Sequence, residues 1–286
     1  MMSLIARRPS QELVDLVATL DGRWDGYRAM CRCPAHQDST PSLSIRQGDR
    51  GILVNCFAGC ASEDVLRELA RVRVTGSHPM PEARPTGTAN VAKIWEEAGP
   101  VRGTLGERYL WRRGLPPDLN DIRFHPRCPH HPKPHTVYKP ALLVAAREGN
   151  NLVAVQRIFL DPETAWYTEK VTLGRLGAGV WQGGGYSSTI GLAEGMETAA
   201  SYSQLKDVPC WASFGTRRFD LCRIPESVTK LILAGDPDGP GRLAVTKAIQ
   251  RYVTSQRIVL VDYSPKGSSD WAAVLQRQKR GEGGEG

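Results

Sequence analysis

The pattern of apolar and polar residues predicts a small β-rich unit flanked by two helices at the start of the chain. Between Ser10 and Leu20 the apolar residues recur at helical spacing, and Ser10 occupies the position of an N-cap. The segment SEDVLRELARV, residues 62–72, has the same period, with Ser62 as its predicted cap. Between these helices, SLSIRQ alternates and GILVNCF is apolar, and both patterns are typical of β-strands.

The pattern changes at residues 75–90, which read TGSHPMPEARPTGTAN. This stretch holds three prolines and two glycines and has almost nothing to bury. Such a composition is typical of a linker. We therefore expect a first domain of residues 1–74, a linker of residues 75–90 and a second unit from residue 91.

Beyond about Thr189, apolar strands alternate with helices. TIGLAEG precedes a helix from about Glu197, CWASFG precedes a loop, KLILAGD precedes a helix that starts near Gly239, and RIVLVDY precedes DWAAVLQRQ. This alternation predicts a parallel sheet covered by helices, so the expected fold class is α/β. We assign residues 91–187 to a basic N-terminal part of the second unit, 188–278 to the sheet with its helices, and 279–286 to a disordered tail.

Length and composition are those of an ordinary globular protein with room for two domains. The chain has 286 residues, of which 41% are hydrophobic and 23% charged. It contains no apolar run of about 18 residues, and its N-terminus lacks the features of a secretion signal. We therefore expect a cytoplasmic protein with no membrane partner.

The positive charge of the chain is concentrated in one segment. The formal net charge is +7, and the segment from Val101 to Pro140 carries eight cationic and three acidic side chains, a net +5. A solvated surface is one interpretation of this excess, and a track for the phosphates of a nucleic acid is the other.

The cysteines indicate a structural zinc site. Cys33 and His36 stand two residues apart, Cys56 and Cys60 stand three apart, and about twenty residues separate the pairs. Thiolate and imidazole are the ligands of tetrahedral zinc, and four protein ligands make a closed site. Cys31 is a spare cysteine that lacks the tight pairing with His36. In a segment of about 70 residues the metal would supply much of the folding free energy.

A second cluster lies in HPRCPHHPKPH, residues 125–135, with Cys128 and His130 among its members. Its spacing is irregular, and loops broken by proline often carry histidine as a polar filler. We interpret it as such a loop, with a second metal site as the alternative.

Acidic side chains follow several of the predicted parallel strands. Glu194 follows IGLA, Asp236 and Asp238 follow LILAG, and Asp270 follows the loop after RIVLVDY, while Glu197 lies one helical turn beyond Glu194. Ligands of open parallel sheets bind beyond the carboxyl ends of the strands. Carboxylates that converge there repel one another unless a cation intervenes, and hard oxygen ligands suit Mg²⁺ or Mn²⁺. The alternative is that the aspartates only cap helices.

These motifs resemble a known family. LAEGMETA is similar to the Glu-Gly motif of the Toprim domain, and LAGDPDGPG is similar to its Asp-x-Asp motif. CPAHQDSTPSLSI with CFAGC resembles the zinc ribbon of bacterial-type DNA primases. RYLWRRGL resembles the Tyr-Leu-x-x-Arg-Gly-Leu signature of the primase core, and WASFGT resembles its Ala-Ser-x-Gly-Thr loop. The motifs stand in the family order from about residue 10 to 276.

The resemblance implies roles for particular residues. Glu194 would be the acid/base carboxylate, Asp236 and Asp238 would hold Mg²⁺ or Mn²⁺, and Asp270 matches the last acidic motif. The metal ligands would be Glu194, Glu197, Asp236, Asp238 and Asp270. The residues that contact template or nucleotide would be Arg108, Arg112, Arg113, Arg123, Arg157 and Lys170. Thr198 and Ala273 replace acids of the family pattern, which puts a second or third metal in doubt.

The expected function is that of a DNA primase which makes short RNA primers on single-stranded DNA from ribonucleoside triphosphates. One structural Zn²⁺ and a catalytic Mg²⁺ or Mn²⁺ are the implied cofactors, and a replicative helicase is a further candidate partner. A phage-like or plasmid-like stand-alone enzyme fits better than the chromosomal one. Two alternatives stay open, a Toprim nuclease and a non-catalytic accessory protein that binds template.

Overall fold

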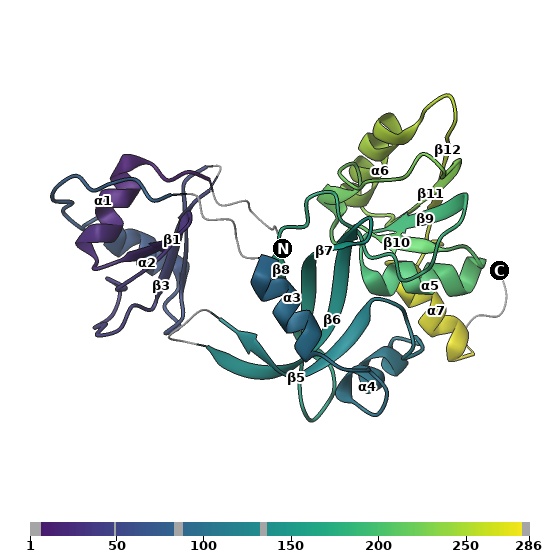
Figure 1. Cartoon of the computed structure of the whole chain (residues 1–286), viewed down its shortest axis with the longest axis horizontal. Helices are drawn as coiled ribbons and strands as arrows, with labels where there is room; N and C mark the ends of the chain where they lie inside the picture. The colour runs from purple at the N-terminus through teal and green to yellow at the C-terminus, as the bar shows by residue number, and fades with distance from the viewer. Residues whose placement is uncertain (1–6, 49, 83–87, 132–135, 282–286) are drawn as a thin grey trace. The chain divides into compact units, whose positions relative to one another are not determined.

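The computed structural model describes residues 7–48, 50–82, 88–131 and 136–281 (Figure 1). It divides into two compact units, one of residues 1–87 with 129–137 and one of residues 88–128 with 138–286. Within the described ranges, every helix is too short or too polar to span a bilayer.

The first unit is built on a four-stranded antiparallel sheet with strand order β1-β2-β3-β4. Its elements are α1 (Gln11–Thr19), β1 (Arg23–Asp25), β2 (Arg28–Cys31), β3 (Leu43–Gln47), β4 (Ile52–Cys56) and α2 (Ser62–Leu69). The hydroxyl of Ser10 accepts a hydrogen bond from the Leu13 amide and caps α1, as predicted. The predicted cap of α2 is wrong by one residue: Ala61 is the N-cap, and no side chain caps this helix.

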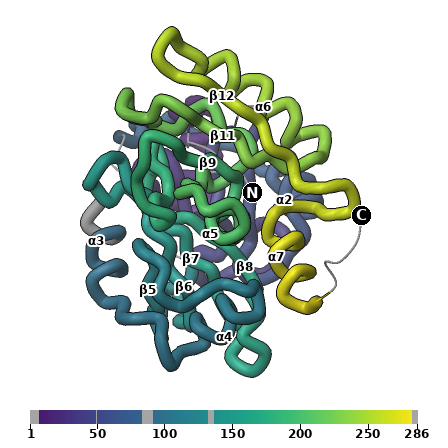
Figure 2. The backbone as a smooth tube through the Cα atoms, turned by 90° about the vertical axis from the view of Figure 1, so that its right-hand side faces the viewer, coloured from purple at the N-terminus to yellow at the C-terminus, as the bar shows by residue number. Residues whose placement is uncertain are grey.

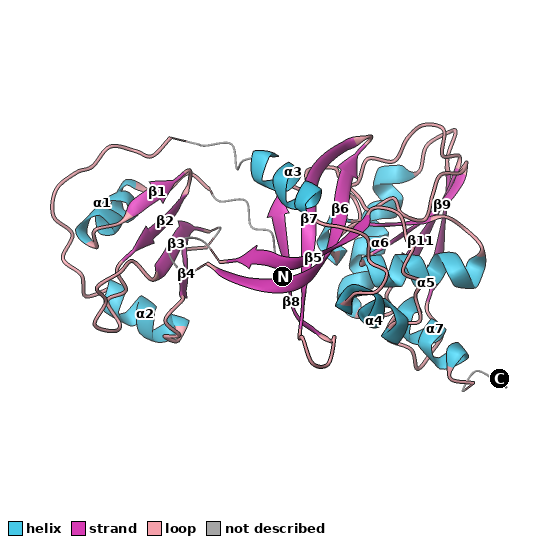
Figure 3. Cartoon of the chain, turned by 60° about the horizontal axis from the view of Figure 1, so that its bottom comes forward, coloured by secondary structure: helices cyan, strands magenta, loops and turns pink. Residues whose placement is uncertain are grey.

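The second unit begins with helices that pack on an antiparallel sheet. The elements are α3 (Thr88–Glu97), α4 (Leu105–Arg112), β5 (Ile122–His130), β6 (Val137–Glu148), β7 (Asn151–Leu160) and β8 (Tyr167–Gly174), with strand order β5-β6-β7-β8. Helix α3 lies against β7 and β8 (Figure 3). It starts at Thr88, so helical structure begins three residues earlier than the composition of residues 75–90 suggests.

The rest of this unit is the predicted parallel sheet covered by helices, and the α/β fold class is confirmed. Its elements are β9 (Thr189–Ala193), α5 (Met196–Lys206), β10 (Cys210–Ala212), a 3₁₀ turn η1 (Thr216–Arg218), β11 (Lys230–Gly235), α6 (Gly239–Tyr252), β12 (Ile258–Tyr263) and α7 (Trp271–Lys279). Helix α6 covers one face, and α5 and α7 cover the other (Figure 2).

The strand order β10-β9-β11-β12 sets the position of the site. All three pairings are parallel, and the chain moves from β9 to β10 on one side before it returns to β11 on the other. The strand order therefore reverses its direction between the neighbouring strands β9 and β11. Such a switch leaves a crevice at the carboxyl ends of the strands, which is where ligands of open α/β sheets bind.

The two parts of the second unit share one apolar core. Tyr109 and Leu110 of α4, Leu142 of β6, Ala199 of α5 and Trp271 of α7 are all buried in it. Contacts between α4 and α5 are thus part of the interior.

Candidate active site and metal site

Glu194 is positioned by the loop that follows β10. Its backbone carbonyl accepts a hydrogen bond from the Gly215 amide at 3.2 Å, and its carboxylate accepts one from the Thr216 hydroxyl. The loop turns back sharply because Phe214 has φ 62° and Gly215 has φ 143°, a region that strongly favours glycine. WASFGT was singled out from the sequence, but the role of Thr216 as the hydrogen-bond donor that holds Glu194 was not foreseen.

Asp236 stands directly after β11, and the pKa of its carboxyl group is strongly raised. Burial, followed by repulsion from Glu194, Asp270 and Asp238, raises the pKa of Asp236 to about 7. Its Oδ1 atom is buried and has no hydrogen-bond partner among the described residues. The structure therefore brings four of the five predicted acidic residues into one electrostatic neighbourhood.

Asp238 and Asp270 also serve as helix caps. An oxygen of Asp238 accepts from the Gly241 amide at 2.7 Å at the start of α6, and an oxygen of Asp270 accepts from the Ala273 amide at 2.7 Å at the start of α7. The alternative that the aspartates only cap helices thus applies in part to Asp238 and Asp270, each of which uses one carboxylate oxygen for the cap. It does not apply to Asp236, which caps no helix.

A divalent cation fits this set of donors. A buried carboxylate oxygen without a partner is costly, and a hard cation relieves both that cost and the repulsion among the acids. Among the described residues, only the Cys/His ligand atoms of the first unit lie close enough together to hold an ion as they stand, so the carboxylates would have to close around the cation. Asp236, Asp238, Asp270 and Glu194 are the residues that would hold Mg²⁺ or Mn²⁺.

Glu197 belongs to a different cluster from the one predicted. It is 5% exposed, and its carboxylate accepts hydrogen bonds from the Tyr109 hydroxyl and from Lys170 Nζ at 2.6 Å. Burial alone would raise the pKa of Glu197, but Lys170 and Tyr109 hold it below its usual range. Its carboxylate is thus engaged by an ion pair, and the sequence spacing gave no sign of this because Lys170 lies on β8.

Four of the six predicted nucleic-acid residues pack against the protein itself. Arg113 stacks on the Trp166 ring at 4.7 Å, and Arg123 donates to the Trp95 carbonyl at 2.9 Å. Arg157 lies half-buried beside Cys128, and Lys170 pairs with Glu197. These four are Arg113, Arg123, Arg157 and Lys170. The other two, Arg108 and Arg112, are exposed on α4.

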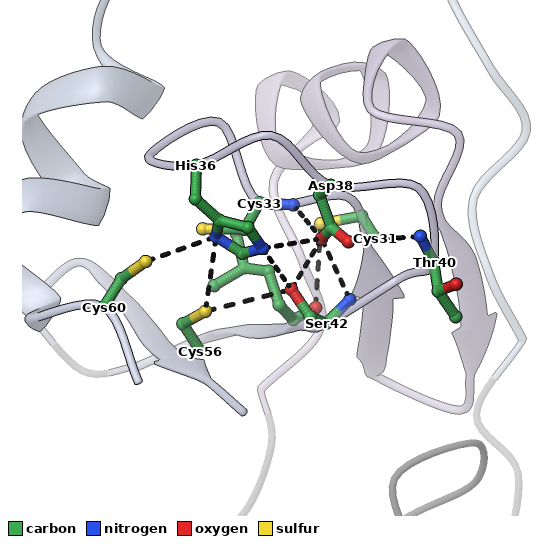
Figure 4. Close-up of polar contacts among 9 residues, drawn as sticks. Cys31, Cys33, His36, Asp38, Thr40, Ser42, Cys56 and Cys60 are labelled. Carbon is green, nitrogen blue, oxygen red and sulfur yellow. Dashed lines mark hydrogen bonds and ion pairs between the residues drawn. The ribbon is translucent and has the colours of Figure 1, made fainter. Parts of the chain in front are cut away.

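The four predicted zinc ligands lie together in the first unit (Figure 4). The ligand atoms of Cys33, His36, Cys56 and Cys60 are all within 4.8 Å of one another, and His36 Nδ1 lies 3.2 Å from Cys60 Sγ. Sulfur ligands about 2.3 Å from a tetrahedral zinc are about 3.8 Å apart, so this donor set fits one zinc ion. Cys31 is not a member: it is buried in β2, and its thiol points to the Leu43 carbonyl at 3.8 Å.

Asp38 organises the loop that carries the first two ligands. Its carboxylate accepts from the Cys33 amide at 2.8 Å and from the Ser42 hydroxyl at 2.5 Å, and it lies 3.8 Å from His36 Nε2 (Figure 4). A carboxylate on this side of the ring favours ligation through the other ring nitrogen, Nδ1, which faces the thiols. Asp38 lies within the motif CPAHQDSTPSLSI, but no role for it could be predicted from the sequence.

The thiols of the cluster perturb one another: the pKa values of Cys33 and Cys60 are raised, and that of Cys56 is lowered by hydrogen bonds that outweigh its burial. Burial and then the neighbouring thiols raise the pKa of Cys33 to about 12, although a hydrogen bond from the Ala35 amide acts in the opposite direction. A bound cation deprotonates such thiols outright. The donor set therefore suits a metal better than a group of free cysteines.

The cysteine and histidines of residues 125–135 form no comparable group among the described residues. Cys128 is buried beside Arg157, and burial raises its pKa to about 11. His135 and Lys133, which belong to the predicted loop and to the basic segment, lie outside the described residues.

Comparisons with known proteins agree with this arrangement of elements. Residues 189–281 match the family model described as Toprim domain. This part of the chain is a Toprim domain. Residues 86–183 match a model described as a domain of unknown function (DUF7146), and a search of curated proteins finds no match. The motif resemblance is thus confirmed for the Toprim domain.

Solved structures of primases are among those similar to this chain. The zinc-binding and RNA polymerase domains of the Aquifex aeolicus primase superpose with a TM-score of 0.50 at 14% identity, over 95% of this chain and 82% of that one. The primase fragment of the bacteriophage T7 primase-helicase gives 0.42 at 13% identity, over 89% and 96%. The RNA polymerase domain of the Mycobacterium tuberculosis primase gives 0.46 at 14% identity, over 69% and 81%. The Aquifex match shows that the chain, with its Cys/His cluster and Toprim domain, has a primase-type fold.

Proposed function

We propose that this protein is a DNA primase that synthesises short RNA primers on single-stranded DNA by metal-dependent nucleotidyl transfer. The observation that carries the proposal is the position of Asp236 at the carboxyl end of β11. There it has a buried oxygen without a described partner and a pKa raised to about 7 by burial and three neighbouring acids. Perturbed carboxylates in the crevice of a parallel sheet are characteristic of functional sites.

Each acidic residue has a distinct part in this proposal. Asp236, Asp238 and Asp270, with Glu194, would hold Mg²⁺ or Mn²⁺, which when bound would supply charge stabilisation for phosphoryl transfer. Glu194 accepts the proton of the primer 3′-hydroxyl. The Thr216 hydroxyl and the Gly215 amide fix Glu194 for this role, since one binds its carboxylate and the other its backbone carbonyl.

The first unit supplies template recognition in this proposal. Cys33, His36, Cys56 and Cys60 hold one zinc ion, which fixes the two loops that carry them. Single-stranded DNA and ribonucleoside triphosphates are the partners we propose, and a replicative helicase is a further one.

A primer-synthesis assay tests the proposal. Labelled ribonucleotides are offered with single-stranded DNA and Mg²⁺, and the products are resolved by length. We expect Glu194→Gln and Asp236→Asn to lower synthesis at least about 100-fold, as loss of a positioned acid/base or metal ligand does. Asp118→Asn is the matched control, because Asp118 is a surface acid that pairs with Arg102.

The same reactions separate the alternatives. Degradation of the DNA without nucleotides would identify a nuclease. DNA binding without polymerisation, unaffected by Mg²⁺, would identify an accessory protein. Wild-type synthesis by both the Glu194 and the Asp236 variants would refute the catalytic assignment.

A further inference from the structure

Strand β12 forms an outer edge of the parallel sheet (Figure 1). It pairs with β11 from Ile258 to Tyr263 without a shift in register. At the opposite edge the chain covers itself, because the backbone of Trp181 exchanges two hydrogen bonds with Ala212 of β10, each at 3.0 Å. Within the described ranges, no strand or isolated bridge covers the outer side of β12 in the same way. Its outward N–H and C=O groups are therefore a template for pairing with another chain.

The side chains of β12 are apolar and exposed on both faces of the strand. Ile258 is 65% exposed, Leu260 42% and Val261 38%. Alternate residues of a strand point to opposite faces, so Ile258 and Leu260 share one face and Val261 lies on the other. The one charge of the strand, Asp262, is engaged by Lys206 Nζ at 3.3 Å. The lysine, proline or bulge that usually protects an edge is thus missing from β12.

The surroundings of this edge are basic. Residues 239–261, which span α6, the turn after it and most of β12, include no acid and four cations, Arg242, Lys247, Arg251 and Arg257. Arg242 lies over the Tyr263 ring at 5.0 Å. Arg257 donates to the carbonyls of Val228 and Pro225, so its charge is not neutralised. Exposed Lys230 is the register partner of Ile258, which places both side chains on one face.

The acids beside this edge are fewer than the cations. Asp262 is paired with Lys206, Asp207 follows Lys206 in the sequence, and Glu226 lines a small cavity together with Arg257. Lys206, Lys230 and the four cations of residues 239–261 therefore leave a positive balance. An occupant of complementary charge carries carboxylates.

The chemistry of the edge selects the kind of occupant. Backbone N–H and C=O groups at strand spacing are satisfied by another extended backbone, and the aliphatic side chains on both faces need apolar partners. A second copy of this chain would bring the same cations to the same edge, and like charges that face each other oppose pairing. A separate acidic protein meets all three requirements.

We infer that β12 docks an extended, acidic segment of a partner protein, which joins the sheet as an additional strand. Aliphatic side chains of that segment cover Ile258, Leu260 and Val261. Its flanking carboxylates lie beside Lys230 and Arg257. This inference goes beyond the proposed function and does not depend on it.

Fluorescence anisotropy with labelled peptides tests the docking edge on the full zinc-loaded chain, without DNA, nucleotides or added Mg²⁺. The acidic probe has a Val-Ile-Val run with glutamates on both sides. A second probe has lysines in place of the glutamates, and a third is the acidic probe with proline in place of its isoleucine. The wild type should bind the acidic probe at least about tenfold more tightly than either of the others, because lysine repels the basic rim and proline removes a backbone donor.

Two variants of the edge test its two kinds of contact. The double variant Ile258→Thr with Leu260→Thr keeps β-branched residues on the strand but removes apolar surface, and it should bind the acidic probe about tenfold more weakly. Lys230→Glu should weaken the acidic probe about threefold and strengthen the lysine probe. The matched controls are Val74→Thr, at a side chain that is 41% exposed in the first unit, and Lys139→Glu, at an exposed position of β6. Neither control should change binding.

Amide hydrogen exchange locates the probe and sedimentation identifies the occupant. The acidic probe should slow exchange in β12 and leave β10 unchanged. Retention of full binding by the double threonine variant, equal binding of the acidic and lysine probes, or protection elsewhere than β12 would overturn the inference. A wild-type dimer that the double threonine variant dissociates would also overturn it, since a second copy would then be the occupant. Because no substrate is present, failure of primer synthesis would leave these results unaffected.

Discussion

Replacing Asp236 with asparagine should stabilise the Mg²⁺-free protein at alkaline pH. In the folded protein the pKa of Asp236 is raised to about 7 by burial and by Glu194, Asp270 and Asp238, whereas the usual value is 3.8. Above pH 4 the unfolded chain loses this proton, but the folded protein keeps it until about pH 7. The free energy of unfolding of the wild type therefore falls across this window, and the asparagine variant lacks this loss.

At pH 8 the raised pKa of Asp236 corresponds to a loss of at most about 4 kcal/mol in the free energy of unfolding of the wild type. Because the side chain is only partly buried, screening by solvent reduces the expected gain of the variant to about 1–2 kcal/mol. Urea unfolding followed by tryptophan fluorescence measures it, on protein dialysed free of Mg²⁺ with zinc retained. The fluorescence reports mainly on the second unit, since Trp24 is the one tryptophan of the sequence outside it.

The pH dependence and the cation are the decisive controls. At pH 4 the two proteins should differ little, and Mg²⁺ at pH 8 should stabilise the wild type more than the variant. A variant that is less stable than the wild type at pH 8 without Mg²⁺ would refute the reasoning, because Asp236 would then have a favourable partner in the folded protein.

Three further predictions concern other parts of the structure. Thr216→Val removes the donor that holds Glu194, so primer synthesis should fall about fivefold with little change in DNA affinity, while Thr216→Ser should retain activity. Lys170→Met leaves the carboxylate of Glu197 buried without its cation and should lower the free energy of unfolding in urea by about 3 kcal/mol. The double variant Lys170→Met with Glu197→Gln should recover most of this loss. If the losses of the two single variants simply add in the double variant, the ion pair is contradicted. Cys56→Ser should release bound zinc, measured by metal analysis, and unfold the first unit by circular dichroism, whereas Cys31→Ser should keep the zinc.

The zinc ligands and the parallel sheet could be predicted because their signals are local in the sequence. Cys33 and His36 share one turn, and the apolar runs before Glu194 and Asp236 each end at a strand terminus. The two carboxylates meet because neighbouring parallel strands end at the same edge, which follows from the alternation of strands and helices.

The partners of Glu197 could not be predicted in the same way. Its distance of three residues from Glu194 suggested a shared metal, but Lys170 and Tyr109 approach it from β8 and α4. Such long-range contacts leave no mark in local spacing. The same holds for Arg157, a surface cation by its residue type, which lies half-buried on β7 beside Cys128.

Binding of Mn²⁺ to the full chain, measured by electron paramagnetic resonance of the free ion, tests the central claim most directly. We predict a site in the zinc-loaded wild-type protein that competes with Mg²⁺, weakens at least about tenfold in Asp236→Asn and persists in Asp118→Asn. Equal affinity of all three proteins for Mn²⁺ would contradict the claim that these carboxylates gather around a divalent cation.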